Sequence, residues 1–153
     1  MRKPFIMLVT LFCTTINYIS LAQEPWKILE KYECLSVTVY DTRDDTYLDD
    51  ENNTAIVTYS QINGTQKTSE LITLVIGSYT NYADILSKES YEDEEYEYIR
   101  YHCRSFDNKS ESADIIIAFI YEKNKNKIVP YCIICSFTFS TKEFVLGKIV
   151  RHV

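Results

Sequence analysis

The feature that most constrains this chain is a series of short segments in which apolar and polar side chains alternate. Alternation of this kind is typical of β-strands that bury one face. The series covers residues 34–40, 54–62, 65–79, 81–87, 96–103, 113–122 and 131–139. Turn residues separate the segments, and no internal repeat or Pro-rich linker divides them. The sequence therefore predicts one mainly β domain with seven or eight strands.

Two glycines indicate where the chain turns or bends within this series of strands. Asn63-Gly64 predicts a two-residue hairpin, because both positions tolerate positive φ. Gly77 lies inside the segment 65–79, where it predicts a bulge or a bend. Apolar residues occur on both faces of that segment, so we expect it to be buried on both sides.

Helix signals flank the strands. Pro25 before Trp26 predicts a short N-terminal helix, because proline at the first helical position loses no hydrogen bond. Residues 140–143, Ser-Thr-Lys-Glu, have the pattern of a capping box and predict a C-terminal helix that packs an apolar stripe against the sheet. Many strands joined by short turns predict an antiparallel up-and-down barrel, which hides its edges by closing. A barrel of eight strands holds one small ligand.

The first 22 residues do not show the alternation of apolar and polar side chains that is typical of the predicted strands. Arg2 and Lys3 precede a mostly apolar run over residues 5–12, and small residues follow near position 22. The run is shorter than the roughly 18 apolar residues that a spanning helix needs, so it predicts a secretory signal peptide rather than an anchor. We expect residues 1–22 to be removed, and residues 23–153 to form an extracellular barrel domain without a membrane segment.

The charge of the chain restricts its partners. The formal net charge of −6 becomes −8 when Arg2 and Lys3 leave with the leader. This balance argues against nucleic acid and anionic lipid as partners and suits a cationic ligand. Much of the negative charge lies in residues 89–97. We expect this run to be a solvated loop held open by its own repulsion.

The cysteine pattern predicts disulfides. After the leader the chain keeps Cys34, Cys103, Cys132 and Cys135. An even number in an oxidising compartment predicts two bonds, and the sequence allows three pairings. Cys132 and Cys135 lie three positions apart on one predicted strand, where they face opposite sides, so a bond between these two is disfavoured. A redox role for the pair is disfavoured too, because such dithiols occupy a helix N-terminus.

Three Asn-x-Ser/Thr sequons follow the leader, at Asn52, Asn63 and Asn108. Each falls in a predicted connection between strands, where an attached glycan would be exposed. These three residues are therefore glycosylation candidates.

Two further patterns accompany this order of elements. Residues 26–29, Trp-Lys-Ile-Leu, open the mature chain, while a Tyr-rich strand leads to Cys103 and Pro130-Tyr131 leads to Cys132. In both respects the chain resembles the secreted lipocalins of ticks, a family that includes histamine-binding proteins. The resemblance implies a lipocalin-like barrel with a short N-terminal helix, a C-terminal helix and a Cys103–Cys132 disulfide. It also implies capture of a small ligand in the saliva of a blood-feeding arthropod, for modulation of host defence.

The chain departs from that family at the places where its amine-binding members hold their ligand. Those members carry Asp directly after the first of these cysteines and Glu-Leu-Trp or Glu-Leu-Tyr before the second. This chain has Arg104 at the first place and Ala118-Phe119-Ile120 at the second, so the amine site is not implied residue by residue. We expect Cys34 to pair with Cys135, across the first and last strands that a closed barrel places side by side.

Catalytic chemistry has few candidates in this sequence. The chain has only two histidines, His102 and His152, so neither a Ser/His/Asp set nor a three-ligand zinc site is indicated. His102 is expected to be an ordinary strand residue. We therefore predict a protein that is not an enzyme, with no catalytic residue, no metal and no cofactor.

Tyrosine is the unusual residue in the composition, with 13 in the chain and 12 after the leader. A tyrosine offers apolar area and one hydroxyl, which suits a ligand pocket or a protein-binding face. The candidates for lining a pocket are Tyr40, Tyr59, Tyr79, Tyr98, Tyr101 and Phe119, with Arg100 or Arg104 available for a carboxylate. The sequence does not show which face of each strand looks inward.

Three functions remain open from the sequence. The first is sequestration of a small hydrophobic or amphipathic molecule, such as a lipid mediator or a sterol, and the apolar strand 115–120 motivates it. The second is binding of a biogenic amine such as histamine or serotonin. The third is a protein-interaction module with a filled core that engages a host protein. A cavity of several hundred cubic ångströms favours a small-molecule carrier, whereas a filled interior favours the interaction module.

Overall fold

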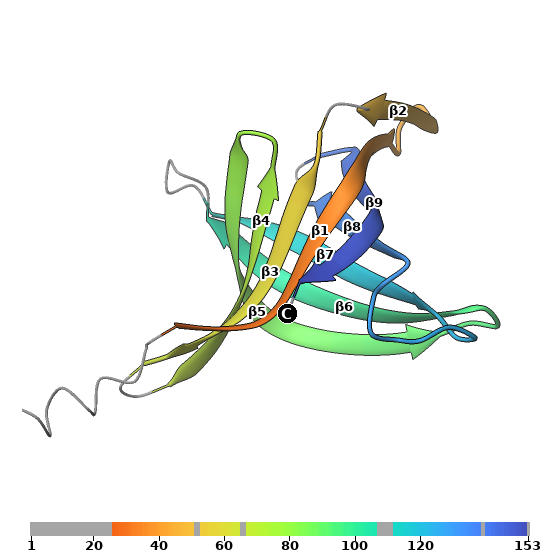
Figure 1. Cartoon of the computed structure of the whole chain (residues 1–153). Helices are drawn as coiled ribbons and strands as arrows, with labels where there is room; N and C mark the ends of the chain where they lie inside the picture. The colour runs from red at the N-terminus through yellow and green to blue at the C-terminus, as the bar shows by residue number, and fades with distance from the viewer. Residues whose placement is uncertain (1–25, 51–52, 65–66, 107–111, 139, 153) are drawn as a thin grey trace, which may run out of the picture.

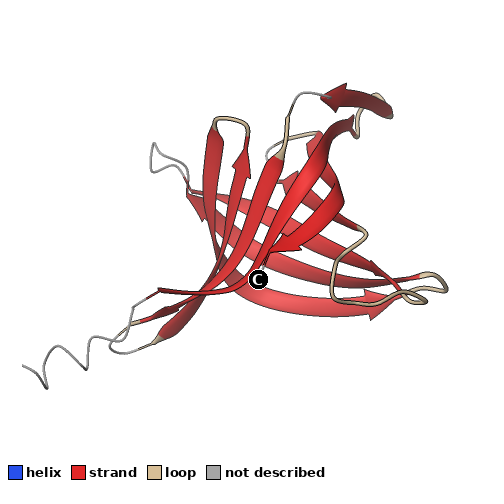
Figure 2. Ribbon diagram, viewed as in Figure 1, coloured by secondary structure: helices blue, strands red, loops and turns tan. Residues whose placement is uncertain are grey.

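The structure, a computed structural model, describes residues 26–50, 53–64, 67–106, 112–138 and 140–152. Its strands are β1 (Trp26–Asp41), β2 (Thr46–Asp50), β3 (Ala55–Asn63), β4 (Thr68–Ile76), β5 (Tyr79–Glu92), β6 (Tyr96–Phe106), β7 (Ser112–Glu122), β8 (Cys132–Phe137) and β9 (Lys142–His152). Neighbouring strands pair in the order β2-β1-β3-β4-β5-β6-β7-β8-β9, and β1 also pairs with β9. β1 and β3 to β9 therefore form a closed antiparallel barrel of eight strands, with β2 added at its rim (Figure 1, Figure 2). The predicted antiparallel barrel is confirmed.

β1 closes the barrel because both of its edges are occupied. One edge pairs with β9, from Lys31 opposite His152 to Asp41 opposite Lys142. The other edge pairs with β3 along its first part and with β2 along its last part. A strand used on both edges leaves no free hydrogen-bonding groups for another chain, which protects the seam from aggregation.

The predicted N-terminal helix is wrong where the structure describes it. Trp26 begins β1 and lies opposite Ile62 on β3, because an extended chain here satisfies its backbone groups in the sheet. Pro25 and the predicted leader, residues 1–22, lie outside the described residues. No helix occurs among the described residues, so that part of the chain contains no helix able to cross a bilayer.

The predicted C-terminal helix is also wrong, since its residues form β9. Ser140 Oγ accepts a hydrogen bond from the backbone N–H of Lys142 at 3.0 Å, but this bond stabilises a turn. Glu143 does not reach back to the cap, and its carboxylate instead accepts a hydrogen bond from Ser136 Oγ at 2.7 Å. β9 pairs with both β1 and β8, and this pairing overrides the local helix signal because it completes the barrel.

The predicted hairpin at Asn63-Gly64 is confirmed between β3 and β4, but its loop is longer than two residues. The N–H of Gly64 bonds to the carbonyl of Lys67 at 3.1 Å. The two-residue turn of this region is Gly77-Ser78, where Gly77 has φ +56°. Segment 65–79 therefore contains a strand, a turn and the first residue of β5, rather than one bent strand.

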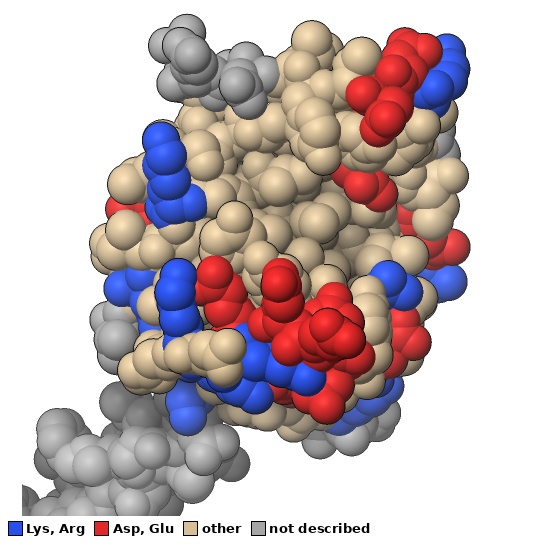
Figure 3. All heavy atoms as spheres, turned by 90° about the vertical axis from the view of Figure 1, so that its right-hand side faces the viewer, with Lys and Arg blue, Asp and Glu red and all other residues tan. Residues whose placement is uncertain are grey.

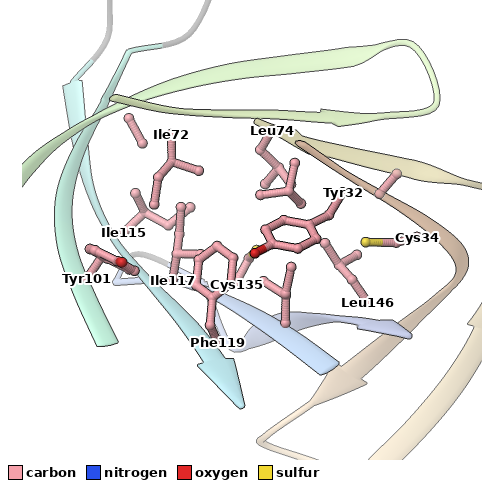
Figure 4. Close-up of a cluster of buried hydrophobic side chains, with 14 of the residues drawn as sticks. Tyr32, Cys34, Ile72, Leu74, Tyr101, Ile115, Ile117, Phe119, Cys135 and Leu146 are labelled. Atoms are coloured by element: carbon pink, nitrogen blue, oxygen red, sulfur yellow. The ribbon is translucent and has the colours of Figure 1, made fainter. Parts of the chain in front are cut away.

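The interior of the barrel is filled at its centre. Side chains from β1, β4 and β6 to β9 point toward a common cluster, as Figure 4 shows. The buried residues labelled there are Tyr32, Cys34, Ile72, Leu74, Tyr101, Ile115, Ile117, Phe119, Cys135 and Leu146. Burying a side chain of this size contributes roughly 1.5–3 kcal/mol, so the centre is stabilised by packing without a ligand.

The barrel wall separates toward one end. β4 and β5 pair over a short stretch that ends at Leu71 opposite Asp84. β5 then bulges after Ile85 and continues to Glu92 beside β6 alone among the described strands. Figure 1 shows the resulting divergence, with the β5–β6 hairpin at the right and the β3–β4 hairpin at the lower left. We call this end, which carries the β3–β4, β5–β6 and β7–β8 connections, the mouth of the barrel.

The four cysteines in the described part of the chain are free thiols, so the structure does not contain the predicted disulfides. Cys103 lies opposite Ile115 on β7, which lies opposite Phe137 on β8. Cys132 is at the other end of β8, five positions away or about 16 Å at the usual rise of a strand. The Cα atoms of Cys103 and Cys132 are therefore beyond the roughly 7 Å that a disulfide allows.

The predicted Cys34–Cys135 bond fails for a different reason, because β9 lies between β1 and β8. Both thiols face the filled interior and are fully buried. Burial raises the pKa of Cys34 to about 12, so this thiol stays protonated at neutral pH. Cys132 is half-buried, whereas Cys135 is buried, and the two side chains point to opposite sides of β8 as predicted.

Candidate functional site

A pocket of about 290 Å³ opens at the mouth of the barrel. It is lined by Glu30, Tyr59, Lys88, Glu97, Ile99, Tyr101, Tyr121 and Lys127. Tyr101 shows why these side chains point inward. It lies on the same face of β6 as Ile99 and Cys103, because side chains two positions apart share a face, and Cys103 belongs to the buried core. The pocket is thus the unfilled continuation of the core toward the mouth.

The floor of the pocket is aromatic. The ring of Tyr101 meets the ring of Phe119 edge-on, with centroids 5.6 Å apart, and lies 5.9 Å from the ring of Tyr59. Phe119 in turn contacts Tyr32, with centroids 5.9 Å apart (Figure 4). Below this layer the side chains are fully buried, so the pocket is a cup at the mouth and not a deep cavity.

Glu30 organises the polar side of the pocket. Its carboxylate accepts a hydrogen bond from the hydroxyl of Tyr32 at 2.8 Å and lies 3.6 Å from the guanidinium of Arg151. Tyr32 also shares a hydrogen bond with Tyr121. Burial, followed by the hydrogen bond to Glu30, raises the pKa of Tyr32 far above its usual value. The hydroxyl of Tyr32 therefore remains a donor at physiological pH.

The other tyrosines of the pocket also keep their protons. Burial raises the pKa of Tyr101 to about 12. Burial and a hydrogen bond to Glu70 raise the pKa of Tyr59 above its usual value. Since a neutral phenol both donates and accepts, the wall offers hydrogen bonds to ligand groups of either kind.

Charges in the pocket are nearly balanced. Glu97 forms an ion pair with Lys127, which belongs to the connection between β7 and β8. The ammonium of Lys88 lies 5.5 Å from the centre of the Tyr101 ring, within cation–π range. With Glu30 opposite these lysines, the lining holds two carboxylates and two ammonium groups. The pocket therefore suits a ligand with apolar and polar parts more than one with a large net charge.

Two of the predicted lining residues reach this pocket, and a third lies beneath it. Tyr59 and Tyr101 line it, and Phe119 forms part of its floor. Tyr79 is 42% exposed at the opposite end of the barrel, where its hydroxyl accepts a hydrogen bond from Asn81. Of the candidate tyrosines, only Tyr59 and Tyr101 therefore meet in this pocket.

The remaining candidates point outward. Tyr40 donates a hydrogen bond to Asp45 at 2.5 Å on the outer surface. Arg100 is bound to Glu89 at 3.2 Å, on the face of β6 opposite to Tyr101, and is not available to a carboxylate inside the barrel. Tyr98 lies on that outer face as well, and Arg104 is exposed there.

Sequence reasoning missed much of the charged and polar lining. The residues concerned are Glu30, Lys88, Glu97, Tyr121 and Lys127, with Arg151 beside Glu30. The inward position of Tyr121 could have been predicted, because it shares a face of the apolar strand β7 with Phe119. Lys88 had no such signal, because the side chains around it are mostly polar. Glu97 had one, because it shares a face of β6 with Ile99 and Tyr101.

The acidic run 89–97 is not the predicted solvated loop, because it forms the end of β5, a tight turn and the start of β6. Asp93 stabilises the turn by accepting hydrogen bonds from the hydroxyl of Tyr98 at 2.7 Å and from the backbone N–H groups of Tyr96 at 2.8 Å and Glu95 at 2.9 Å. These bonds, led by that of Tyr98, lower the pKa of Asp93. Figure 3 views the molecule from the right-hand side of Figure 1 and shows acidic side chains gathered on that face, with basic side chains among them.

Two other hollows border the mouth. A groove of about 360 Å³ lies where β4 and β5 separate, between Ser69 and Leu86. A cleft of about 610 Å³ lies between the β7–β8 connection and β9, beside Val129 and Ile149. In the described part of the chain, no group of three or more His, Cys, Asp or Glu side chains is placed to hold a metal ion. The mouth pocket is the candidate site, because it combines inward tyrosines, a carboxylate that is hydrogen-bonded to Tyr32 and a closed floor.

The glycosylation candidate Asn63 is exposed at the end of β3, while Asn52 and Asn108 lie outside the described residues. No model of a known protein family, no curated protein and no solved structure matches this chain.

Proposed function

We propose that this protein is a secreted, lipocalin-like barrel that binds a small amphipathic molecule at its mouth. The observation that carries the proposal is the cup formed by Tyr59, Tyr101 and Tyr121 above the filled core. Aromatic walls with hydroxyl groups bind molecules that have both an apolar ring or chain and a polar group.

The size of the pocket narrows the class of ligand. Its volume of about 290 Å³ is at the lower end of the range of ligand pockets. The fully buried Ile72 and Ile117 occupy the centre of the barrel, where a sterol or a long acyl chain would have to lie. A compact ligand, of the size of one substituted aromatic ring system, therefore fits better than a long lipid.

Secretion and host-defence modulation belong to the same proposal and rest on the leader-like residues 1–22 and on the resemblance to tick lipocalins. Free thiols are compatible with an oxidising compartment here, because burial raises the pKa of Cys34 and that of Cys103 to about 12. A protonated, buried thiol reacts slowly with oxidants.

A cationic amine is the second candidate ligand. The ammonium of Lys88 already lies over the ring of Tyr101. An amine ligand would place its own ammonium on the same wall, where Glu30 supplies a carboxylate. This candidate requires Lys88 to move aside.

Three indole probes of similar size separate these possibilities: serotonin is cationic, indole-3-acetate is anionic and tryptophol is uncharged. We expect isothermal titration calorimetry on the mature chain to detect tryptophol binding, and the amine candidate requires serotonin to bind more tightly than the other two. Absence of heat for all three at about millimolar concentration would overturn the proposal.

The matched variants are Ile99→Trp and Tyr98→Trp. Ile99 lines the pocket, so the larger ring fills it and should abolish binding. Tyr98 is the adjacent residue on the outer face, so its replacement should leave binding unchanged. Equal loss in both variants, with both still folded by circular dichroism, would place the binding site elsewhere.

A further inference from the structure

Four tyrosine rings form a continuous row on the outer surface near the mouth. Tyr91 on β5 stacks on Tyr98 of β6, with centroids 4.7 Å apart and planes 7° apart. Tyr98 lies 6.3 Å from Tyr96, which lies 5.8 Å from Tyr131 just before β8. We call these four residues the tyrosine row. None of them lines the mouth pocket.

The tyrosine row is exposed at its two ends, half-buried at Tyr96 and Tyr98, and firmly positioned. Tyr91 is 43% exposed and Tyr131 is 56% exposed. The register places Ile120 directly opposite Tyr98 on the outer face, yet Ile120 is only 8% exposed. The hydroxyl of Tyr98 is also held by Asp93 at 2.7 Å. The row is therefore a packed layer, which a partner can contact without first ordering four loose side chains.

Most negative charges beside the row are neutralised. On the outer side, Glu89 pairs with Arg100 and Glu122 pairs with Lys125. On the inner side, Glu92 pairs with Lys123 at 3.3 Å and Glu97 pairs with Lys127. At the turn next to the row, the exposed Glu94 and Glu95 form no ion pair with the described residues. The unneutralised carboxylates thus lie at the end of the hairpin where the rings are exposed.

Arg100 shows how a cation uses this surface. Its guanidinium lies 5.0 Å from the centre of the Tyr91 ring and donates a hydrogen bond to the Tyr91 hydroxyl at 2.8 Å. Stacking of a guanidinium on an aromatic face is favourable, and more so for arginine than for most cations. The remaining rings of the row have no such partner among the described cation–π contacts.

We propose that the tyrosine row is a docking surface for an extended, arginine- and lysine-rich segment of a partner protein. Basic side chains of that segment stack on Tyr96, Tyr98 and Tyr131 and meet the carboxylates of Glu94 and Glu95. The charge of the chain, −6 overall, disfavours a second copy, a nucleic acid or an anionic membrane at the same place. This surface is separate from the mouth pocket, so the proposal does not depend on the proposed ligand.

The probe is a short arginine-rich peptide, with the same peptide carrying glutamine for every arginine as its control. Titration of the isotope-labelled mature chain, followed by amide chemical shifts, should move signals of residues 91–98 and 131 with the arginine peptide only. We expect binding to weaken as ionic strength rises, because exposed charges are screened. Equal shifts with the glutamine peptide, or shifts confined to other surfaces, would overturn the proposal.

Variants test the two parts of the surface separately. Tyr131→Ser removes one exposed ring outside the strands and should weaken peptide binding about threefold. Glu94→Lys should weaken it by about fivefold, because it replaces attraction by repulsion. Asp44→Lys makes the same charge change in the exposed turn between β1 and β2 and should leave binding unchanged. An equal loss with Asp44→Lys would mean that only net charge matters.

Ile99→Trp keeps the two proposals distinguishable, because it fills the mouth pocket and leaves the outer face intact. We expect this variant to bind the arginine peptide as the parent does. Sedimentation of the free protein as a dimer that Tyr131→Ser dissolves would instead assign the tyrosine row to self-association and would overturn the proposal.

Discussion

Tyr98 and Tyr101 lie three residues apart on β6 and serve opposite sides of the barrel wall. Tyr98 stacks on Tyr91 on the outer surface, whereas Tyr101 lines the mouth pocket and contacts Phe119. The two residues have the same chemistry and similar positions along the barrel. Substitutions at these two sites therefore separate functions of the pocket from functions of the surface.

We predict that Tyr101→Leu weakens binding of tryptophol by about fivefold to tenfold, because the substitution removes an aromatic wall and a hydroxyl. Tyr98→Leu should leave this affinity unchanged. Calorimetry on both variants checks the prediction, and a larger effect of Tyr98→Leu would contradict the assignment of the pocket.

Phe119 should be important for stability, because it is 4% exposed and contacts the rings of Tyr32 and Tyr101. We expect Phe119→Ala to lower the free energy of unfolding by about 3–5 kcal/mol. Tyr47→Ala, at a residue that is 68% exposed, should change it by about 0.5 kcal/mol or less. Urea denaturation measures both, and similar values for the two variants would contradict the core described above.

The conformation of residues 142–152 can be tested by the sign of one substitution. Val145 lies in β9 and pairs with Thr38 on β1 and Ile134 on β8. Val145→Ala should lower the free energy of unfolding by up to about 1 kcal/mol, because alanine is a poorer strand residue than valine. In a helix the same change would raise it. Thermal unfolding followed by circular dichroism distinguishes the two results.

The four thiols in the described part of the chain should remain reduced and unreactive in the folded protein. Burial raises the pKa of Cys103 to about 12 and that of Cys132 to about 11, so few thiolates exist at neutral pH. We expect iodoacetamide to label the native protein slowly and the urea-unfolded protein at four sites. Dithiothreitol should not change the melting temperature. A drop in melting temperature on reduction would indicate a disulfide.

Stability should fall at high pH. Burial raises the pKa of Tyr101 from 10.0 to about 12 in the folded state. Between these values the unfolded chain loses a proton that the folded chain keeps, so the stabilisation present below about pH 10 is lost as the pH rises toward 12. Urea midpoints measured from pH 8 upward should show this loss. Tyr101→Phe should reduce its steepness, and an unchanged slope would argue against the buried phenol as its cause.

The strands were predictable because alternation is a local property. Segments 54–62, 96–103 and 113–122 are close to β3, β6 and β7. The C-terminal element was predicted wrongly because its conformation depends on β1, more than a hundred residues earlier in the chain. Ser at position 140 and Glu at position 143 suit a turn before a strand as well as a capping box before a helix. The local sequence therefore cannot distinguish a strand from a helix here.

The site was only partly predictable, because the inward face of a strand changes wherever a bulge shifts its alternation. β5 shifts after Ile85, so Lys88 points inward and Glu89 points outward. β9 has an irregularity at Lys148, which has φ +51° and lies outside the ladder between Gly147 and Ile149. A count of positions from the apolar residues of either strand therefore assigns the wrong face beyond these points.

Because β4 and β5 stop pairing beyond Leu71 and Asp84, the wall of the barrel is continuous around its centre and is open between these two strands only at the mouth. At the mouth, the distance between the β3–β4 and β5–β6 hairpins is therefore set by side-chain packing and not by a backbone ladder, so the ends of these hairpins can be displaced relative to each other without breaking a strand pair.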